Sequence, residues 1–272
     1  MRSSTLNNRF PRHRSLWYAA GWVLLLAAWA VVAASQPEYM LPSPARTLST
    51  LLDLIVSEAL LLALAATLWR AAVGLLLALL LGCAWGYLSA RFPAFHALTM
   101  PGLQLLMSTP GIIFVIVAMV WFGTRSVIVV LVVAAVTTPV ITTATTQAFT
   151  AIDAELKEMV TLFRFPRWRV LRHLVVPSVA PPLLAATTVA LGQSIRVAVM
   201  AELLASATGM GAAIRLAQIN IETAEVFAYA LMMTALTFAL EASLIAPMKR
   251  RFAAHLPAVS GSPWRSGQVK AV

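Results

Sequence analysis

The sequence predicts an all-α, polytopic membrane protein with about six transmembrane helices. Of its 272 residues, 60% are hydrophobic and only 11% are charged, and the mean hydropathy is +0.85. Soluble domains carry about a quarter charged residues. A helix that crosses a bilayer needs about 20 predominantly apolar residues. Six runs reach roughly this length: Leu16–Ala34, Ala59–Ser89, Leu103–Phe122, Ser126–Thr146, Val179–Ser206 and Val226–Ala246.

The N-terminal region, residues 1–58, is expected to hold a basic tail, the first span and an outer segment. Its basic start, apolar stretch and small residues are also typical of a secretory signal peptide. The apolar stretch is long for a signal peptide and further spans follow, so we expect a retained signal-anchor helix, with cleavage as the alternative. Beyond it, Leu41–Pro44 reads LPSP and predicts a turn before an interfacial helix over Ala45–Val56.

The membrane domain is expected over residues 59–246. Its first run, Ala59–Ser89, is long enough to tilt or to extend beyond the bilayer. The next run, Leu103–Phe122, is weakened by Pro101, Pro110 and Gly111, which spans tolerate where neighbouring helices satisfy the freed backbone groups. Three glycines of the first run predict close helix packing: Gly74, Gly82 and Gly86.

A polar segment, Asp153–Pro177, separates the fourth and fifth apolar runs. Early carboxylates, Asp153, Glu155 and Glu158, favour a helix start because they oppose the positive N-terminal dipole. Pro166 disfavours helix at the residue before it. Arg167 then begins a second amphipathic piece, which we expect to end before Pro177. The segment is therefore expected to lie in water and to contact something outside the membrane.

The formal net charge is +10, and its distribution predicts the orientation. With a cytoplasmic N-terminus, fifteen of the 20 Lys and Arg residues fall in the tails and loops on the inner side, and three fall outside. Such an asymmetry fixes topology, so both termini and the 153–177 segment are expected in the cytoplasm. Topology explains the basic charge better than nucleic-acid binding does. The tail, residues 247–272, is expected to be disordered.

Catalytic signatures are absent from the sequence. It contains no phosphate-binding G-x-x-x-x-G-K, no H-E-x-x-H and no G-x-S-x-G, and its four His residues lack metal-ligand spacing. The single Cys83 excludes an intrachain disulfide. We therefore expect no enzyme activity, catalytic residue, cofactor or metal. A transport role is favoured, with an energy source outside this chain.

The polar segment resembles the cytoplasmic loop of the permease subunits of bacterial ABC importers. That loop has the pattern Glu-Ala-Ala, three residues, Gly, nine residues, Ile-x-Leu-Pro. Glu158 takes the Glu position, and Leu174, Val176 and Pro177 take the last positions at matching spacing. The two residues after Glu158 are not alanine. Arg164 stands at the glycine position, which predicts a turn geometry different from that of the family.

Other segments resemble the nitrate, taurine and aliphatic-sulfonate branch of these permeases over about residues 40 to 245. Four motifs carry the resemblance: LPSP at 41–44, TLWRAAVG at 67–74 with Arg70 and Gly74 kept, Pro110 followed by Trp121-Phe122-Gly123, and AELLASATGMG at 201–211. Isoleucine stands at 116, where that branch has a second proline.

The resemblance implies a type I ABC importer permease fold, alternating access in the bacterial inner membrane, and three partners. These are a cytoplasmic ATP-binding subunit, a periplasmic solute-binding protein and a second permease copy, which is expected to form a homodimer. The resemblance also implies that the polar segment is the part of this chain that couples to the ATP-binding subunit. We expect the contacts at Glu158, Arg164, Phe165, Pro166, Arg167, Trp168 and Pro177. The alternative is a basic juxtamembrane loop that only binds lipid head groups.

Two arginines lie within the apolar runs. Arg196, beside Gln193 and Ser194, is a candidate for attracting an anion in a translocation path that also includes Glu202; packing against a carboxylate such as Glu202 is the alternative. Arg70 either has a buried partner or snorkels to the outer interface.

The favoured function is the permease subunit of an ATP-driven importer of a small solute. Nitrate, sulfonates, taurine and pyrimidine vitamin precursors all fit the resemblance. One alternative is an ion-coupled secondary transporter, which needs intramembrane acidic relays, and Glu202 and Glu241 are among the few carboxylates in the spans. Another is a membrane scaffold without transport.

Overall fold

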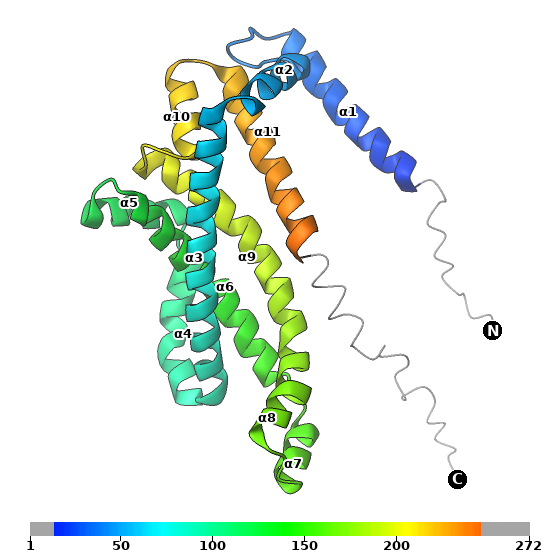
Figure 1. Cartoon of the computed structure of the whole chain (residues 1–272), viewed down its shortest axis with the longest axis vertical. Helices are drawn as coiled ribbons and strands as arrows, with labels where there is room; N and C mark the ends of the chain where they lie inside the picture. Colours follow the sequence, from blue (N-terminus) through cyan, green and yellow to red (C-terminus); the bar gives the residue numbers. More distant parts are fainter. Residues whose placement is uncertain (1–13, 246–272) are drawn as a thin grey trace, which may run out of the picture.

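The computed structural model describes residues 14–245, and every regular element in that range is helical. The helices form an elongated bundle (Figure 1). One end holds α7 (Ala154–Leu162) and α8 (Arg167–Val170), and the other holds α2 (Pro44–Ile55) and α10 (Met210–Ile219). Both the basic start of the chain and the tail expected to be disordered, 247–272, lie outside the described residues. Five helices are long and apolar enough to cross a bilayer, and a bent helix pair would make a sixth. The all-helical prediction with about six spans is confirmed.

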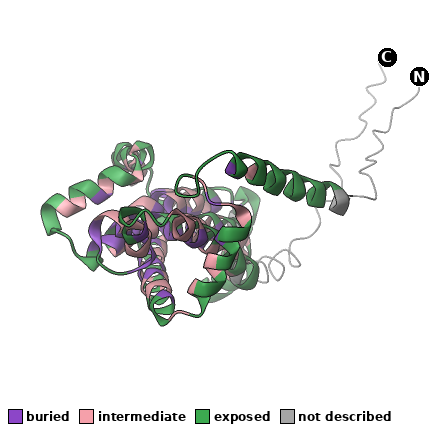
Figure 2. Cartoon of the chain, turned by 90° about the horizontal axis from the view of Figure 1, so that it is seen from above, coloured by how far each residue is buried: buried purple, intermediate pink, exposed green. Residues whose placement is uncertain are grey.

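The first helix, α1 (Arg14–Ala34), leans away from the bundle (Figures 1 and 2), and most of its described side chains are exposed. It is attached near its C-terminal end, where Trp29 Nε1 donates to the Pro42 carbonyl at 3.1 Å and the Trp29 ring stacks on Phe227. The next helix, α2 (Pro44–Ile55), begins as the LPSP motif predicts. Ser43 Oγ accepts from the Arg46 N–H at 3.2 Å, and proline occupies the first helical turn.

Close packing of α3 (Glu58–Arg91) against α6 (Ser126–Thr150) forms the centre of the bundle. Small residues at every fourth position of α3 face α6: Gly74, Ala78, Gly82 and Gly86. A Cβ atom on Gly82 would lie 2.7 Å from the Ile141 Cβ, and one on Gly74 would lie 2.6 Å from a Val133 methyl. The predicted close approach is confirmed, because only glycine lets the two backbones come so near.

The run Leu103–Phe122 does not form one straight helix. The segment belongs to two helices, α4 (Pro93–Ser108) and α5 (Gly111–Phe122), whose axes differ by 100°. Thr109 between them is extended, with ψ 125°, as expected for a residue before proline. α4 packs beside α3 and α6, while α5 crosses α6 and the later helix α9.

After α7 (Ala154–Leu162) and α8 (Arg167–Val170), the helical segment does not end before Pro177 as expected. A π-helical turn, η1 (Leu171–Val175), leads directly into α9 (Val176–Ala205). The Val176 N–H bonds back to the Leu171 carbonyl, so the turn before Pro177 is wider than an α-helical one. Because proline lacks an N–H and crowds the carbonyl four residues earlier, a wider turn there lets the helix continue.

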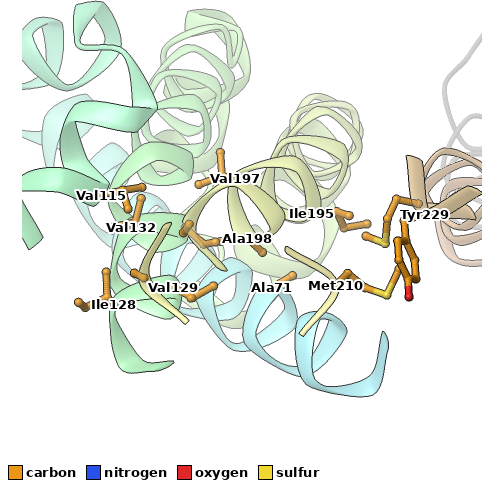
Figure 3. Close-up of a cluster of buried hydrophobic side chains, with 14 of the residues drawn as sticks. Ala71, Val115, Ile128, Val129, Val132, Ile195, Val197, Ala198, Met210 and Tyr229 are labelled. Atoms are coloured by element: carbon orange, nitrogen blue, oxygen red, sulfur yellow. The ribbon is translucent and has the colours of Figure 1, made fainter. Parts of the chain in front are cut away.

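The last described elements are α10 (Met210–Ile219), α11 (Thr223–Leu240) and a second π-helical turn, η2 (Glu241–Ile245). The main core lies where α3, α5, α6, α9, α10 and α11 meet (Figure 3). Its fully or nearly fully buried members include Val115, Ile128, Val133, Ala198 and Met210. Buried positions are concentrated in the middle of the bundle in the view of Figure 2.

Candidate transport site and coupling segment

The polar segment forms a helix, a tight turn and a second helical start, as its prolines predict. Asp153 caps α7 by accepting the Glu155 N–H at 2.9 Å. α7 ends in a Schellman arrangement, in which the Phe165 N–H reaches the Val160 carbonyl, at 3.3 Å. Arg164 sits in the left-handed position of this turn, with φ +48°. The arginine therefore adopts the backbone conformation that glycine favours, and its presence does not abolish that kind of turn.

All seven residues expected to couple to an ATP-binding subunit are exposed: Glu158, Arg164, Phe165, Pro166, Arg167, Trp168 and Pro177. Trp168 is 67% exposed, and large apolar side chains beside it, Leu162 and Phe163, are 78% and 66% exposed. Aromatic and apolar side chains gathered with arginines at the far end of the bundle are typical of a protein interaction surface.

A small apolar cluster fixes the polar segment to the spans. Ala148 and Ile152 at the end of α6 pack with Val179 at the start of α9. Phe149 joins this cluster and meets Tyr87 of α3 in an edge-to-face contact, with ring centroids 5.2 Å apart. The base of the segment is therefore packed against three spans, α3, α6 and α9.

Arg196 lines a groove of about 590 Å³ between α9, α10 and α11. Its guanidinium lies back over Gly192, whose missing side chain leaves room for it, and Gly192 in turn faces Thr237 of α11. Thr188, Thr234 and Glu241 also line the groove. The other residues expected in the path do not line it: Gln193, Ser194 and Glu202. The Ser194 hydroxyl donates to the Leu191 carbonyl of its own helix.

Glu202 instead forms an ion pair with Arg70 of α3, with Nη1 and Oε1 2.5 Å apart. Glu202 is completely buried and Arg70 is 8% exposed. Arg70 also donates to the Thr208 carbonyl at 2.8 Å, to the Thr208 hydroxyl at 2.6 Å and to the Ser126 hydroxyl at 3.1 Å. Of the two alternatives for Arg70, the structure supports a buried partner, and the contact between Arg196 and Glu202 is not formed.

The second carboxylate oxygen of Glu202 is satisfied as well. It accepts from the Thr67 hydroxyl at 2.6 Å and from the Gly211 N–H at 3.2 Å, while Thr67 accepts from the Met210 N–H at 2.8 Å. Gly209 has φ +105°, and a Cβ atom on it would overlap the Glu202 carboxylate. The two motifs at 67–74 and 201–211 thus form one buried polar network. Nothing in their spacing along the chain indicated that they meet.

The fold and these sites define a class of protein: a polytopic membrane permease with an exposed segment continuous with a span and a groove between spans. More than half of the chain, residues 74–246, matches the family described as the binding-protein-dependent transport system inner membrane component. The chain belongs to this family, and the predicted resemblance is confirmed. Thr188, Thr234 and Glu241 line the groove but were not predicted as path residues from the sequence. Glu241, at the start of η2, shares the groove with Arg196 only because α11 packs antiparallel to α9.

Three relatives have names that specify a solute. The chain is 28% identical to SsuC of Bacillus subtilis strain 168, described as an aliphatic sulfonates transport permease, over 75% of each chain. It is 30% identical to the riboflavin transport system permease protein RibX of Chloroflexus aurantiacus, over 80% of this chain and 85% of that protein. It is 26% identical to the taurine transport system permease protein TauC of Escherichia coli K12, over 92% and 94%.

A solved structure shares the fold. A chain of the MetNI methionine ABC transporter, in an inward-facing conformation, superposes with a TM-score of 0.54 at 18% sequence identity. The match covers 72% of this chain and 99% of that one. The likeness confirms the ABC permease type of helical fold.

Proposed function

We propose that this chain is the transmembrane subunit of an ATP-driven importer that carries a small anionic solute across the bacterial inner membrane by alternating access. The observation that carries the proposal is one continuous helical path, Arg167–Ala205, which starts in the exposed segment and bears Arg196 in the groove. From Trp168 to Arg196 this path spans about 42 Å. A displacement of the exposed segment would therefore move α9, which forms one side of the groove.

The segment 153–177 is the proposed contact with a cytoplasmic ATP-binding subunit. Hydrolysis belongs to that subunit because this chain has no phosphate-binding loop. Trp168 and Arg167 are the proposed anchors, since tryptophan and arginine dominate binding energy at interfaces. A loop that only binds lipid head groups would need the basic charges, but not the exposed apolar side chains Leu162 and Phe163.

For the solute, the relatives' names disagree, so the proposal rests on the groove. A guanidinium that faces a groove can bind an oxyanion through two parallel N–H bonds, which favours a sulfonate, a taurine-like solute or nitrate. The groove is open along one side, and a second copy of the chain is the proposed cover. The α2/α10 end would then receive an external solute-binding protein. An ion-coupled carrier fits less well, because Glu202, the fully buried carboxylate of the described spans, is held by Arg70.

The coupling proposal is tested with Trp168→Ala in the full chain, coexpressed with its ATP-binding subunit. Loss of a hot-spot tryptophan is expected to lower copurification of that subunit at least tenfold and to lower solute uptake. The matched control is Trp69→Ala, which removes an equally exposed tryptophan of α3 that lies far from the segment. Equal copurification and uptake in both variants would overturn the coupling role.

A further inference from the structure

The groove that contains Arg196 also contains a carboxylate of opposite charge, Glu241. Among the described residues neither side chain forms an ion pair or a side-chain hydrogen bond. Any nitrogen of Arg196 is thus more than 4 Å from any carboxylate oxygen of Glu241. Arg196 is exposed in the single chain and Glu241 is half-buried. Once a bilayer or a second copy covers the groove, two unpaired, opposite charges are costly unless something polar bridges them.

The helix directions bring these two charges toward one another. α9 and α11 run in opposite directions along the bundle (Figure 1), and η2, which begins at Glu241, packs against α9. Long side chains on a helix lean toward its N-terminus. Arg196 therefore leans toward the α7/α8 end, as its position over Gly192 shows. By the same rule Glu241 is expected to lean the other way, toward Thr237, the residue that faces Gly192.

We infer that the groove binds a zwitterionic solute, whose anionic group pairs with Arg196 and whose cationic amine pairs with Glu241. This inference rests on the proposed function and narrows the solute from anions in general to amino acids of the sulfonic or carboxylic type. Thr188, Thr234 and Thr237 supply hydroxyls between the two charges, and Phe238 and Val199 supply apolar walls for a short carbon chain. The volume of about 590 Å³ is ample for such a molecule.

The inference is tested with two probes of nearly equal shape, taurine and propane-1-sulfonate, in which a methyl group replaces the ammonium. Uptake of both is measured in proteoliposomes that hold the full complex, normalised to assembled complex. Glu241→Gln is expected to lower the ratio of taurine to propane-1-sulfonate uptake about tenfold or more, because one charge-assisted hydrogen bond is lost. Arg196→Gln is expected to lower the uptake of both probes, since both carry the sulfonate.

A second variant covers the case in which Glu241→Gln does not assemble. Thr237→Lys leaves Glu241 in place and adds a cation one helical turn away, so it should lower the same ratio. The control is Glu222→Gln, an exposed carboxylate outside the groove, which should keep the wild-type ratio. A wild-type ratio in Glu241→Gln, or in Thr237→Lys, would overturn the zwitterion inference alone. If the wild-type complex takes up neither probe while it hydrolyses ATP, the proposed sulfonate transport falls with it.

Discussion

At the scale of single residues, the buried pair of Arg70 and Glu202 explains why so few charges are tolerated in these spans. Inside a bilayer an unpaired charge is expensive, and a pair persists only when its remaining donors and acceptors are also bonded. Here Arg70 has four hydrogen bonds, and Glu202 accepts on both oxygens. The pair holds α3, α6, α9 and the turn before α10 together.

Neutralising one member of this pair should destabilise the protein strongly. In Glu202→Gln the guanidinium of Arg70 would stay buried without its counter-charge, which costs about 3–5 kcal/mol in comparable cases. The expected result is a lower melting temperature and a lower yield of folded protein in detergent. Glu222→Gln, at an exposed position, is the control. A melting temperature of Glu202→Gln equal to that of the wild type would show that the pair contributes little.

At the scale of elements, the stripe of small residues on α3 decides how near α6 can come. Lipid chains are as apolar as leucine, so the helices gain little from hydrophobic burial and rely on close van der Waals packing. On the facing side, α6 carries threonines that return their hydroxyls to its own backbone, as Thr138 and Thr142 do at 2.7 and 2.9 Å. Two further threonines of α6 reach α3: the Thr145 hydroxyl contacts Cys83 Sγ at 3.8 Å, and the Thr146 hydroxyl donates to the Gly86 carbonyl at 3.3 Å.

Filling this contact should separate the two helices. A Cβ atom on Gly82 would overlap the Cβ of Ile141 and approach the Thr138 carbonyl at 3.0 Å, so Gly82→Val should cost at least about 1–3 kcal/mol. Gly102→Val is the matched control, because nothing lies within 4 Å of a Cβ at that helical glycine. Thermal unfolding of both variants in the same detergent measures the difference. If both unfold at the same temperature, the α3–α6 packing is less tight than described.

At the scale of the whole molecule, the charge distribution and the shape together predict an orientation. The segment with Arg164, Arg167, Arg169 and Arg172 lies at one end of the bundle, and α2 lies at the other (Figure 1). Positive residues are retained on the cytoplasmic side, so the two ends should differ in their access from outside the cell.

Cysteine labelling in intact cells tests this orientation. In a Cys83→Ala background, which removes the single native cysteine, Glu38→Cys should react with a membrane-impermeant maleimide. Arg169→Cys should react only after the cells are opened. Both side chains are exposed, so burial does not explain a difference. Strong labelling of Arg169→Cys from outside would reverse the proposed topology and remove the cytoplasmic coupling segment.

The sequence by itself determined the features that depend on local composition. Apolar run length and scarcity of charge predicted an all-helical membrane domain. LPSP, Pro166 and the glycines of α3 predicted a turn before a helix, a break and a close contact, because each acts through its own backbone or its nearest neighbours. The resemblance of four short motifs identified the family. These effects need no knowledge of which helices are neighbours.

Only the tertiary structure decided which distant residues meet and which prolines break a helix. Pro110 ends α4 because Thr109 is extended, whereas Pro177 is absorbed by a wider turn. Arg70 and Glu202 are 132 residues apart in the chain, yet their charges pair. Glu241 reaches the groove of Arg196 only through the antiparallel course of α11. Such contacts depend on how the helices pack over the whole bundle. They cannot be predicted from the spacing of residues along the sequence.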